Sequence, residues 1–142
     1  MYDKPNATDL LDAARLHIEQ NVVPHIKDDR VLYFQTLVAI NVMKVVRSEI
    51  ELKPKHLRMV WKALESLENA STTMPHETHL LEQAVQNRLA KLCVDIRAGH
   101  YDDPDADTAL LDFLTMEATL QLEVANPKFL QQLATEDQAI PQ

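Results

Sequence analysis

The chain has 142 residues, and its 22 acidic and 14 basic side chains give a formal net charge of −8 at pH 7. This length is typical of one domain, and the acidic excess weighs against general nucleic-acid binding. The single glycine argues against a fold rich in tight hairpins or phosphate-binding loops, and the single cysteine excludes an internal disulfide. We expect one helical domain over residues 1–142. We place it in the cytoplasm, because no basic segment followed by a long apolar core opens the sequence.

The first predicted helix begins near Asn6 or Thr8, because either side chain is able to cap it, and it ends at Pro24. Small and large apolar residues recur along it at helical spacing. They predict one buried face, made by Leu10, Leu11, Ala14, Ile18 and Val22.

The most apolar stretch spans residues 31–52 and predicts a helix that is capped by Asp28 or Asp29 and ends before Pro54. At 100° per residue its apolar side chains share one broad arc, which implies contact with more than one neighbour. We therefore interpret it as the central helix of a bundle. Ionisable residues in and before the stretch exclude a membrane span. A polar stripe lies opposite the arc and contains Asn41, Lys44, Ser48 and Glu51.

Three more helices and a short last one are predicted at residues 54–68, 76–98, 104–125 and 127–134. Gly99 suits the cap after residue 98, and Asp103 suits the cap before Pro104. The predicted fold class is all-α, a single bundle of five main helices plus a short C-terminal helix. Residues 1–5 and 135–142 are expected to be frayed.

Several residues of these helices are predicted to lie in the core. Trp61 is expected to anchor it, and Cys93 is expected to be a buried thiol that packs like a small apolar residue. In the helix at 104–125 the inward positions are predicted to be Leu110, Leu111, Leu114, Ala118 and Leu122.

Glu49 is the unusual residue of the 31–52 helix, because its direction falls inside the apolar arc. A buried carboxylate without a partner would destabilise the fold by roughly several kcal/mol. It must therefore pair with a cation, reach solvent or take up a proton. A structural ion pair with a basic side chain such as Arg97 is one interpretation. The alternatives are a functional acid or ligand-binding carboxylate, and simple exposure near the end of the helix.

A basic patch lies between residues 44 and 62, because this stretch contains six basic side chains and only two acidic ones, Glu49 and Glu51. It is either a solvated face or a surface for an anionic ligand or an acidic partner. The polar stripe leaves similar alternatives open, since its amide, ammonium and hydroxyl groups suit a carboxylate or phosphate, a neighbouring helix, or water. The six cations are Lys44, Arg47, Lys53, Lys55, Arg58 and Lys62.

Motifs for catalysis were not found in the sequence. His76 and His79 are three residues apart, whereas two zinc ligands on one helix face of a protease are four apart. The acidic run at 102–107 lacks the turn glycine and closing glutamate of a calcium loop. No nucleophile motif or glycine-rich nucleotide loop is present. We therefore expect neither an enzyme nor a metal or other cofactor.

Short motifs spread over residues 5–129 together resemble a bacterial family of small helical domains of unknown function. That family occurs beside, or fused to, kinases of the aminoglycoside-phosphotransferase fold that are associated with acyl-CoA dehydrogenases. The chain departs from it in a longer loop at 70–79, in its C-terminal tail, and at Ile50 and Leu52. The motifs are Pro5-x-Ala7-x-Asp9-Leu10-Leu11-x-Ala13, Val23-Pro24, Val38-Ala39-x-Asn41, Val45-Val46-Arg47-x-Glu49, Ile96-Arg97-x-Gly99 and Val124-x-Asn126-Pro127-Lys128-Phe129.

The resemblance implies that this chain is a non-catalytic accessory subunit of such a kinase. The kinase would act on hydroxyacyl-CoA-type substrates. The alternative is a helical domain that binds acyl-CoA or another anionic small molecule. A homo-oligomer is a further alternative, and neither nucleic acid nor a membrane is an expected partner. The candidate ligand or partner contacts are Asn41, Lys44, Arg47, Glu49, Arg58 and Arg97.

Overall fold

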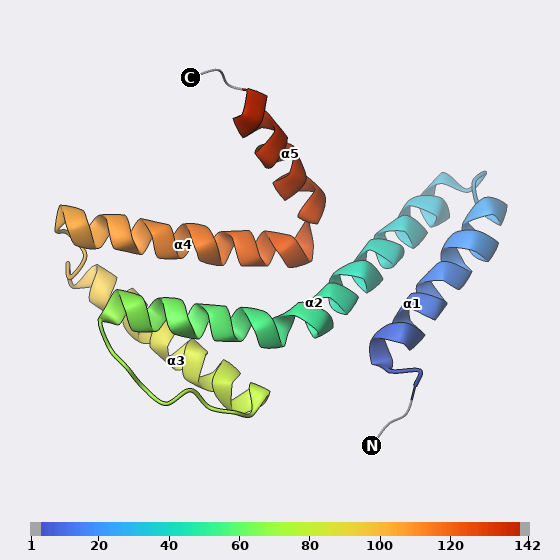
Figure 1. The fold of residues 1–142 in the computed structure, drawn as a ribbon. Helices are drawn as coiled ribbons and strands as arrows, with labels where there is room; N and C mark the ends of the chain where they lie inside the picture. The colour runs from blue at the N-terminus through green and yellow to red at the C-terminus, as the bar shows by residue number, and fades with distance from the viewer. Residues whose placement is uncertain (1–3, 140–142) are drawn as a thin grey trace. The chain divides into compact units, whose positions relative to one another are not determined.

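A computed structural model describes residues 4–139, and within that range it contains helices and no strand. The all-α prediction is therefore confirmed. The chain divides into two compact units, Met1–Leu52 and Lys53–Gln142, which we call unit 1 and unit 2. One helix, α2 (Arg30–Glu68), contributes to both units (Figure 1). The single-domain and single-bundle predictions stay predictions.

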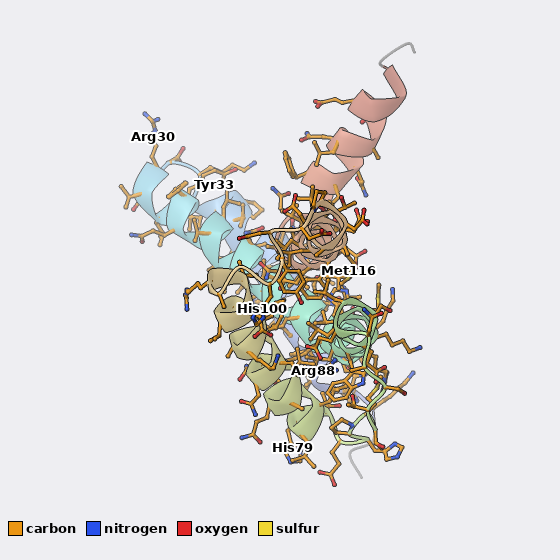
Figure 2. The ribbon with its side chains drawn as sticks, turned by 90° about the vertical axis from the view of Figure 1, so that its left-hand side faces the viewer. Arg30, Tyr33, His79, Arg88, His100 and Met116 are labelled. Atoms are coloured by element: carbon orange, nitrogen blue, oxygen red, sulfur yellow. The ribbon has the colours of Figure 1, made fainter. Side chains whose placement is uncertain are left out.

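Unit 1 contains α1 (Ala7–His17), a π-helical turn η1 (Ile18–Val22), a 3-10 turn η2 (Val23–His25) and the first part of α2. Asn6 caps α1 as predicted, because its side chain accepts a hydrogen bond from the Asp9 amide at 2.9 Å. Asp29 accepts in the same way from the Val31 and Leu32 amides at the start of α2. Arg30, beside this cap, extends away from the helix (Figure 2).

Unit 2 contains the rest of α2 together with α3 (Thr78–Arg97), α4 (Pro104–Ala125) and α5 (Pro127–Ala139). The later part of α2 lies between α3 and α4 in Figure 1, and these three helices supply the hydrophobic core. Its buried side chains are Val60, Trp61, Leu64, Leu81, Val85, Leu92, Leu110, Phe113 and Leu120.

The predicted helix boundaries in unit 2 are set by local chemistry. The Asp103 side chain accepts from the Asp105 amide at 3.0 Å and caps α4, with Pro104 in its first position. Gly99 has a φ of +82° after the end of α3, a conformation that glycine adopts without a Cβ penalty. Asn126 accepts from the Phe129 amide at 3.3 Å and caps α5.

The predicted break between two helices at Pro54 is wrong, because α2 runs through it as one helix. Proline removes one donor from the helical ladder, here the partner of the Ile50 carbonyl. Residues with good helix propensity flank it, and Leu57, Val60 and Trp61 downstream pack in or against the core. These contributions outweigh the loss of one hydrogen bond, so the predicted helices at 31–52 and 54–68 are one.

The predicted core is partly confirmed. Trp61 is buried, whereas Cys93 is exposed, so its interpretation as a buried thiol is wrong. Leu111 and Leu114 were predicted to face inward in α4, but both are exposed, and Phe113 is buried instead. The prediction failed because α4 is apolar on several sides, so the hydrophobic pattern alone did not identify the core-facing side.

The arc of the 31–52 segment was predicted to contact several neighbours, and this prediction is also wrong. Large side chains of the arc, namely Val38, Val42, Val46 and Ile50, are exposed, whereas the buried Ile40 lies on the opposite side of α2. At the other end of the chain, α5 extends beyond the predicted end at residue 134 to Ala139, and the fraying of the chain ends stays a prediction. The remaining terminal residues of that prediction, 1–3 and 140–142, lie outside the described residues.

Candidate functional site

Two of the predicted contact residues, Lys44 and Arg47, pair with acidic side chains of unit 1. Arg47 Nε lies 2.9 Å from Asp12 Oδ2 of α1, an ion pair without the alignment of a hydrogen bond. Arg47 Nη2 lies 3.0 Å from Glu51 Oε1, one helical turn further along α2. Lys44 Nζ lies 3.9 Å from Glu19 Oε1. These cations join α2 to the segment that precedes it.

Arg15 completes this network from the side of α1. Its Nε lies 3.0 Å from Asp12 Oδ1 and its Nη1 lies 2.6 Å from Glu19 Oε2. Three cations and three carboxylates therefore balance one another, and Arg15 is largely buried, with 15% of its side chain exposed. The network leaves little free positive charge for an anionic ligand. Its geometry fits a structural role, which is to fix α1 against α2.

Glu49 is exposed on α2, so of the interpretations left open for it the structure agrees with exposure to solvent and not with a buried carboxylate. It has a contact within the chain and is therefore not an isolated charge. Asn41 is also exposed on α2. Arg58 and Arg97 are exposed and belong to unit 2, so the structure does not gather the predicted contact residues into one described site. The pair of Glu49 with Arg97 stays a prediction.

The basic patch is reduced further in unit 2. Lys53 Nζ lies 2.8 Å from Glu82 Oε1 of α3, so Lys44, Arg47 and Lys53 all have acidic partners. The side chains of Lys55, Arg58 and Lys62 are exposed. Half of the patch is thus neutralised by neighbouring carboxylates, and a concentrated anion-binding surface is not supported.

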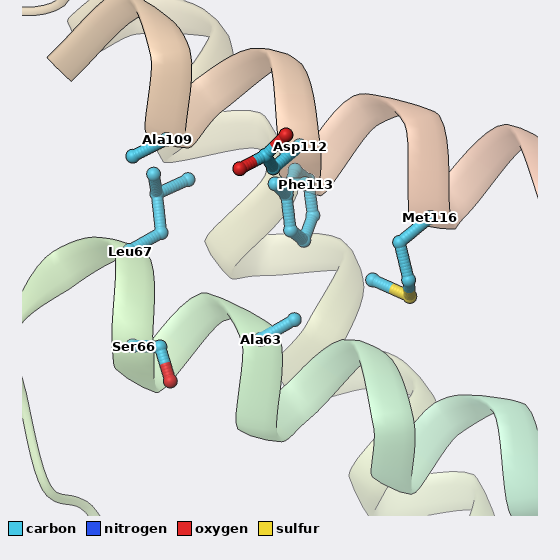
Figure 3. A pocket seen from close by; sticks show the side chains of 7 residues that line it. All are labelled: Ala63, Ser66, Leu67, Ala109, Asp112, Phe113 and Met116. Atoms are coloured by element: carbon cyan, nitrogen blue, oxygen red, sulfur yellow. The ribbon is translucent and has the colours of Figure 1, made fainter. Parts of the chain in front are cut away.

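An open groove lies between α2 and α4 in unit 2 and has a volume of about 370 Å³. Figure 3 shows Phe113 and Met116 of α4 directed toward α2, and Leu67 of α2 directed toward α4 near Ala109. The Asp112 carboxylate lies beside Phe113 and supplies the one charge of the lining. The other lining residues are small, namely Ala63, Ser66 and Ala109.

α4, one wall of this groove, is an acidic helix, and one of its carboxylates, Asp112, lines the groove. The helix carries five carboxylates and no lysine or arginine. Asp105 lies seven residues before Asp112 and therefore on the same side of the helix. Sequence reasoning did not identify this groove, because it placed Leu111 and Leu114 inward. Small residues on two helices form part of the groove. The sequence shows these residues, but it does not show that the two helices pack against each other.

Among the side chains that the structure describes within residues 4–136, no group of three or more histidine, cysteine or acidic side chains is placed to hold a metal ion. Of the candidate metal ligands, His79 Nδ1 lies 3.4 Å from Glu77 Oε2, and both side chains are well exposed. Within the same described range, no helix is long and apolar enough to cross a membrane.

The sequence model of a domain of unknown function, DUF6285, matches residues 26–129, which is most of the chain. The chain belongs to the DUF6285 family. The matched range contains all of α2, α3 and α4. The DUF6285 domain therefore includes the exposed face of α2 and the α2–α4 groove. No curated protein and no solved structure matches the chain.

Proposed function

We propose that this DUF6285 protein is a non-catalytic accessory subunit that binds a kinase of the aminoglycoside-phosphotransferase fold in the cytoplasm. The kinase would act in the breakdown of hydroxyacyl-CoA-type compounds. The resemblance of the sequence motifs suggests the kinase, and the α2–α4 groove with Asp112 in its lining is the observation that supports docking. The family assignment itself adds no activity.

The groove has the composition of an interface centre rather than of a catalytic site. The half-buried Leu67 and Met116 offer apolar surface over the buried Phe113, and Asp112 stands at its edge. Interfaces typically combine such an apolar centre with a charged rim that steers the partner. The proposed partner therefore presents an apolar side chain flanked by lysine or arginine.

The first experiment is a tagged pull-down from the native host, with mass spectrometry of the co-purifying proteins. A stoichiometric kinase of the phosphotransferase fold supports the proposal, and its activity is then measured with and without this chain. We expect Asp112→Lys and Ala63→Arg to weaken the complex at least tenfold, about 1.4 kcal/mol or more. Asp28→Lys, an exposed acid of unit 1, is the matched control and should leave binding unchanged. A kinase that is equally active without the chain would contradict the proposal.

The alternative is a binding domain for acyl-CoA or another anion. It is less well supported, because Lys44, Arg47 and Lys53 have carboxylate partners and only part of the basic patch is open. A ligand that binds the folded chain raises its melting temperature with increasing ligand concentration. A concentration-dependent shift across a panel of acyl-CoAs, lost in Arg58→Ala, would favour this alternative over the kinase proposal.

A further inference from the structure

The side of α2 that points away from α1 in unit 1 is apolar and open to solvent. Its large side chains are between 40% and 67% exposed, with Val31 and Phe34 at the upper end. Ile40, Lys44 and Arg47 mark the other side, where Ile40 is buried and the two cations pair with acids before α2. At 100° per residue, Val38 and Val42 lie nearly opposite Ile40. The exposed apolar side chains are Val31, Phe34, Val38, Val42, Val46 and Ile50.

This side of α2 has a spacing that reads the same in both directions. We use the name α2 stripe for these six apolar side chains, and its four central members, Phe34, Val38, Val42 and Val46, are separated by four residues throughout. In an antiparallel pair of two such helices, Val38 of each copy faces Val42 of the other, and Phe34 faces Val46. A two-fold axis requires this reciprocity, since a contact from i to j is matched by one from j to i.

The charged residues of α2 at the ends of the stripe favour one of the two orientations, while Asp28 and Asp29 precede the helix and Asp29 caps it. Arg30 precedes Val31 at one end, Glu49 stands at the other end, and both are exposed. An antiparallel pair brings Arg30 of each copy near Glu49 of the other, in addition to the contact that Glu49 has within its own chain. A parallel pair would place like charges together. The residues along the flanks are uncharged: Gln35, Asn41 and Ser48.

We propose that a second copy of this chain covers the α2 stripe as an antiparallel, two-fold symmetric helix pair. The stripe runs over about 30 Å of helix at 1.5 Å per residue, long enough for a helix-pair interface. Covering it on both copies buries roughly 1,000 Å² in total, which lies at the low end for a specific interface. The dimer is therefore concentration-dependent. It goes beyond the kinase proposal, which uses the groove in unit 2.

The first test measures the mass of the full-length chain by sedimentation velocity over a range of concentrations. We expect the wild type to move from monomer to dimer as concentration rises. Val38→Glu and Val42→Glu each place a charge at the centre of the stripe and should shift the transition to at least tenfold higher concentration. Val94→Glu, at a 60% exposed position of α3, is the matched control and should dimerise like the wild type. Circular dichroism checks that all variants are equally helical.

The second test fixes the orientation. Arg30→Glu and Glu49→Arg should each weaken dimerisation about tenfold, because each places like charges together across the axis. The double variant restores the opposite charges and should recover most of the loss. In a Cys93→Ser background, a mixture of Val38→Cys and Val42→Cys chains should form the mixed disulfide in preference to either symmetric one.

Three results would overturn the proposal. One is a wild-type chain that stays monomeric up to several hundred micromolar. Another is a dimer that Val38→Glu and Val42→Glu leave intact, which would place the interface elsewhere. The third is a charge-swapped double variant that is no better than the single variants, which would exclude the antiparallel arrangement.

Discussion

The guanidinium carbon of Arg88 lies 4.4 Å from the centre of the Trp61 ring, while its Nη2 lies 2.8 Å from Glu68 Oε2. Arg88, labelled in Figure 2, comes from α3, and the other two residues come from α2. The cation thus contacts an aromatic face and a carboxylate of the neighbouring helix at once. With 14% of its side chain exposed, Arg88 ties α3 to α2 at the edge of the core of unit 2.

Replacement of Arg88 should therefore destabilise unit 2. We expect Arg88→Ala to lower the free energy of unfolding by about 2 kcal/mol, because it removes the ring contact and leaves Glu68 without this partner. Arg88→Lys should cost about 1 kcal/mol, since it keeps the charge but not the planar group. Urea denaturation measures both, with the exposed Arg97→Ala as the control. If Arg88→Ala and Arg88→Lys lowered the free energy of unfolding equally, the positive charge at this position would contribute nothing to stability.

Leu64 is the most completely buried side chain of the described residues, with an exposed fraction of 0%. Leu64→Ala should lower the free energy of unfolding by about 2–5 kcal/mol, because it leaves a cavity among α2, α3 and α4. Leu111→Ala changes the same residue type at a 61% exposed position and should stay within about 0.5 kcal/mol. Chemical denaturation of the two variants compares them directly. Similar losses would show that the α4 side chain is also buried in solution.

The features that were predictable from the sequence are those that depend on a few neighbouring residues. The caps at Asn6, Asp29 and Asp103 follow from side chains that accept backbone hydrogen bonds two or three residues away. Gly99 follows from the left-handed conformation that helix ends often need. The helical class follows from periodicity and from the near absence of glycine.

The features that were not predictable depend on residues far apart in the chain. Arg47 and Lys44 were interpreted as candidate ligand contacts, and only the packing of α1 beside α2 reveals Asp12 and Glu19 as their partners. Pro54 was expected to end a helix, since propensity describes the local cost but not the core contacts that offset it. The α2–α4 groove needs the pairing of two helices and could not be derived from either helix alone.

The loop after α2 is tied to the helix by Glu65, whose Oε1 accepts from the Thr72 amide at 2.8 Å and from its hydroxyl at 3.1 Å. The amide hydrogen bond is the main cause that lowers the pKa of Glu65 below its ordinary value. A carboxyl group whose pKa is lowered by folding stabilises the folded state at pH values above its pKa in the unfolded chain, about 4.3. This stabilisation is lost as the pH falls through the pKa of the group in the folded state.

Glu65→Gln should therefore be less stable than the wild type at pH 7, and the difference should shrink toward pH 3. Urea denaturation midpoints at several pH values measure this difference. Thr72→Ala is the matched control, since it removes the hydroxyl but keeps the amide donor, and it should retain most of the pH dependence. A gap between Glu65→Gln and the wild type that stays constant from pH 7 to pH 3 would refute this linkage.

Gly99 combines a φ of +82° with a close neighbour, because an added Cβ would lie 2.8 Å from Asp102 Oδ2. Gly99→Ala should lower the free energy of unfolding by about 1–2 kcal/mol through the left-handed backbone. Combining it with Asp102→Ala removes the contact but not the strain, so only part of the loss should be recovered. Thermal denaturation of the single and double variants measures both effects. Full recovery in the double variant would assign the whole cost to the side-chain contact.

The continuity of α2 across the two units has a consequence for how its backbone amides exchange with solvent. Downstream of Pro54 the helix is covered by the core of unit 2, whereas upstream Ile40 is the buried side chain of α2 in unit 1. Because Pro54 has no amide proton, the ladder between these parts is interrupted next to the boundary at Leu52. Local opening upstream therefore does not require opening downstream. One helix should show two levels of hydrogen-exchange protection, with slow exchange only on the C-terminal side of the proline.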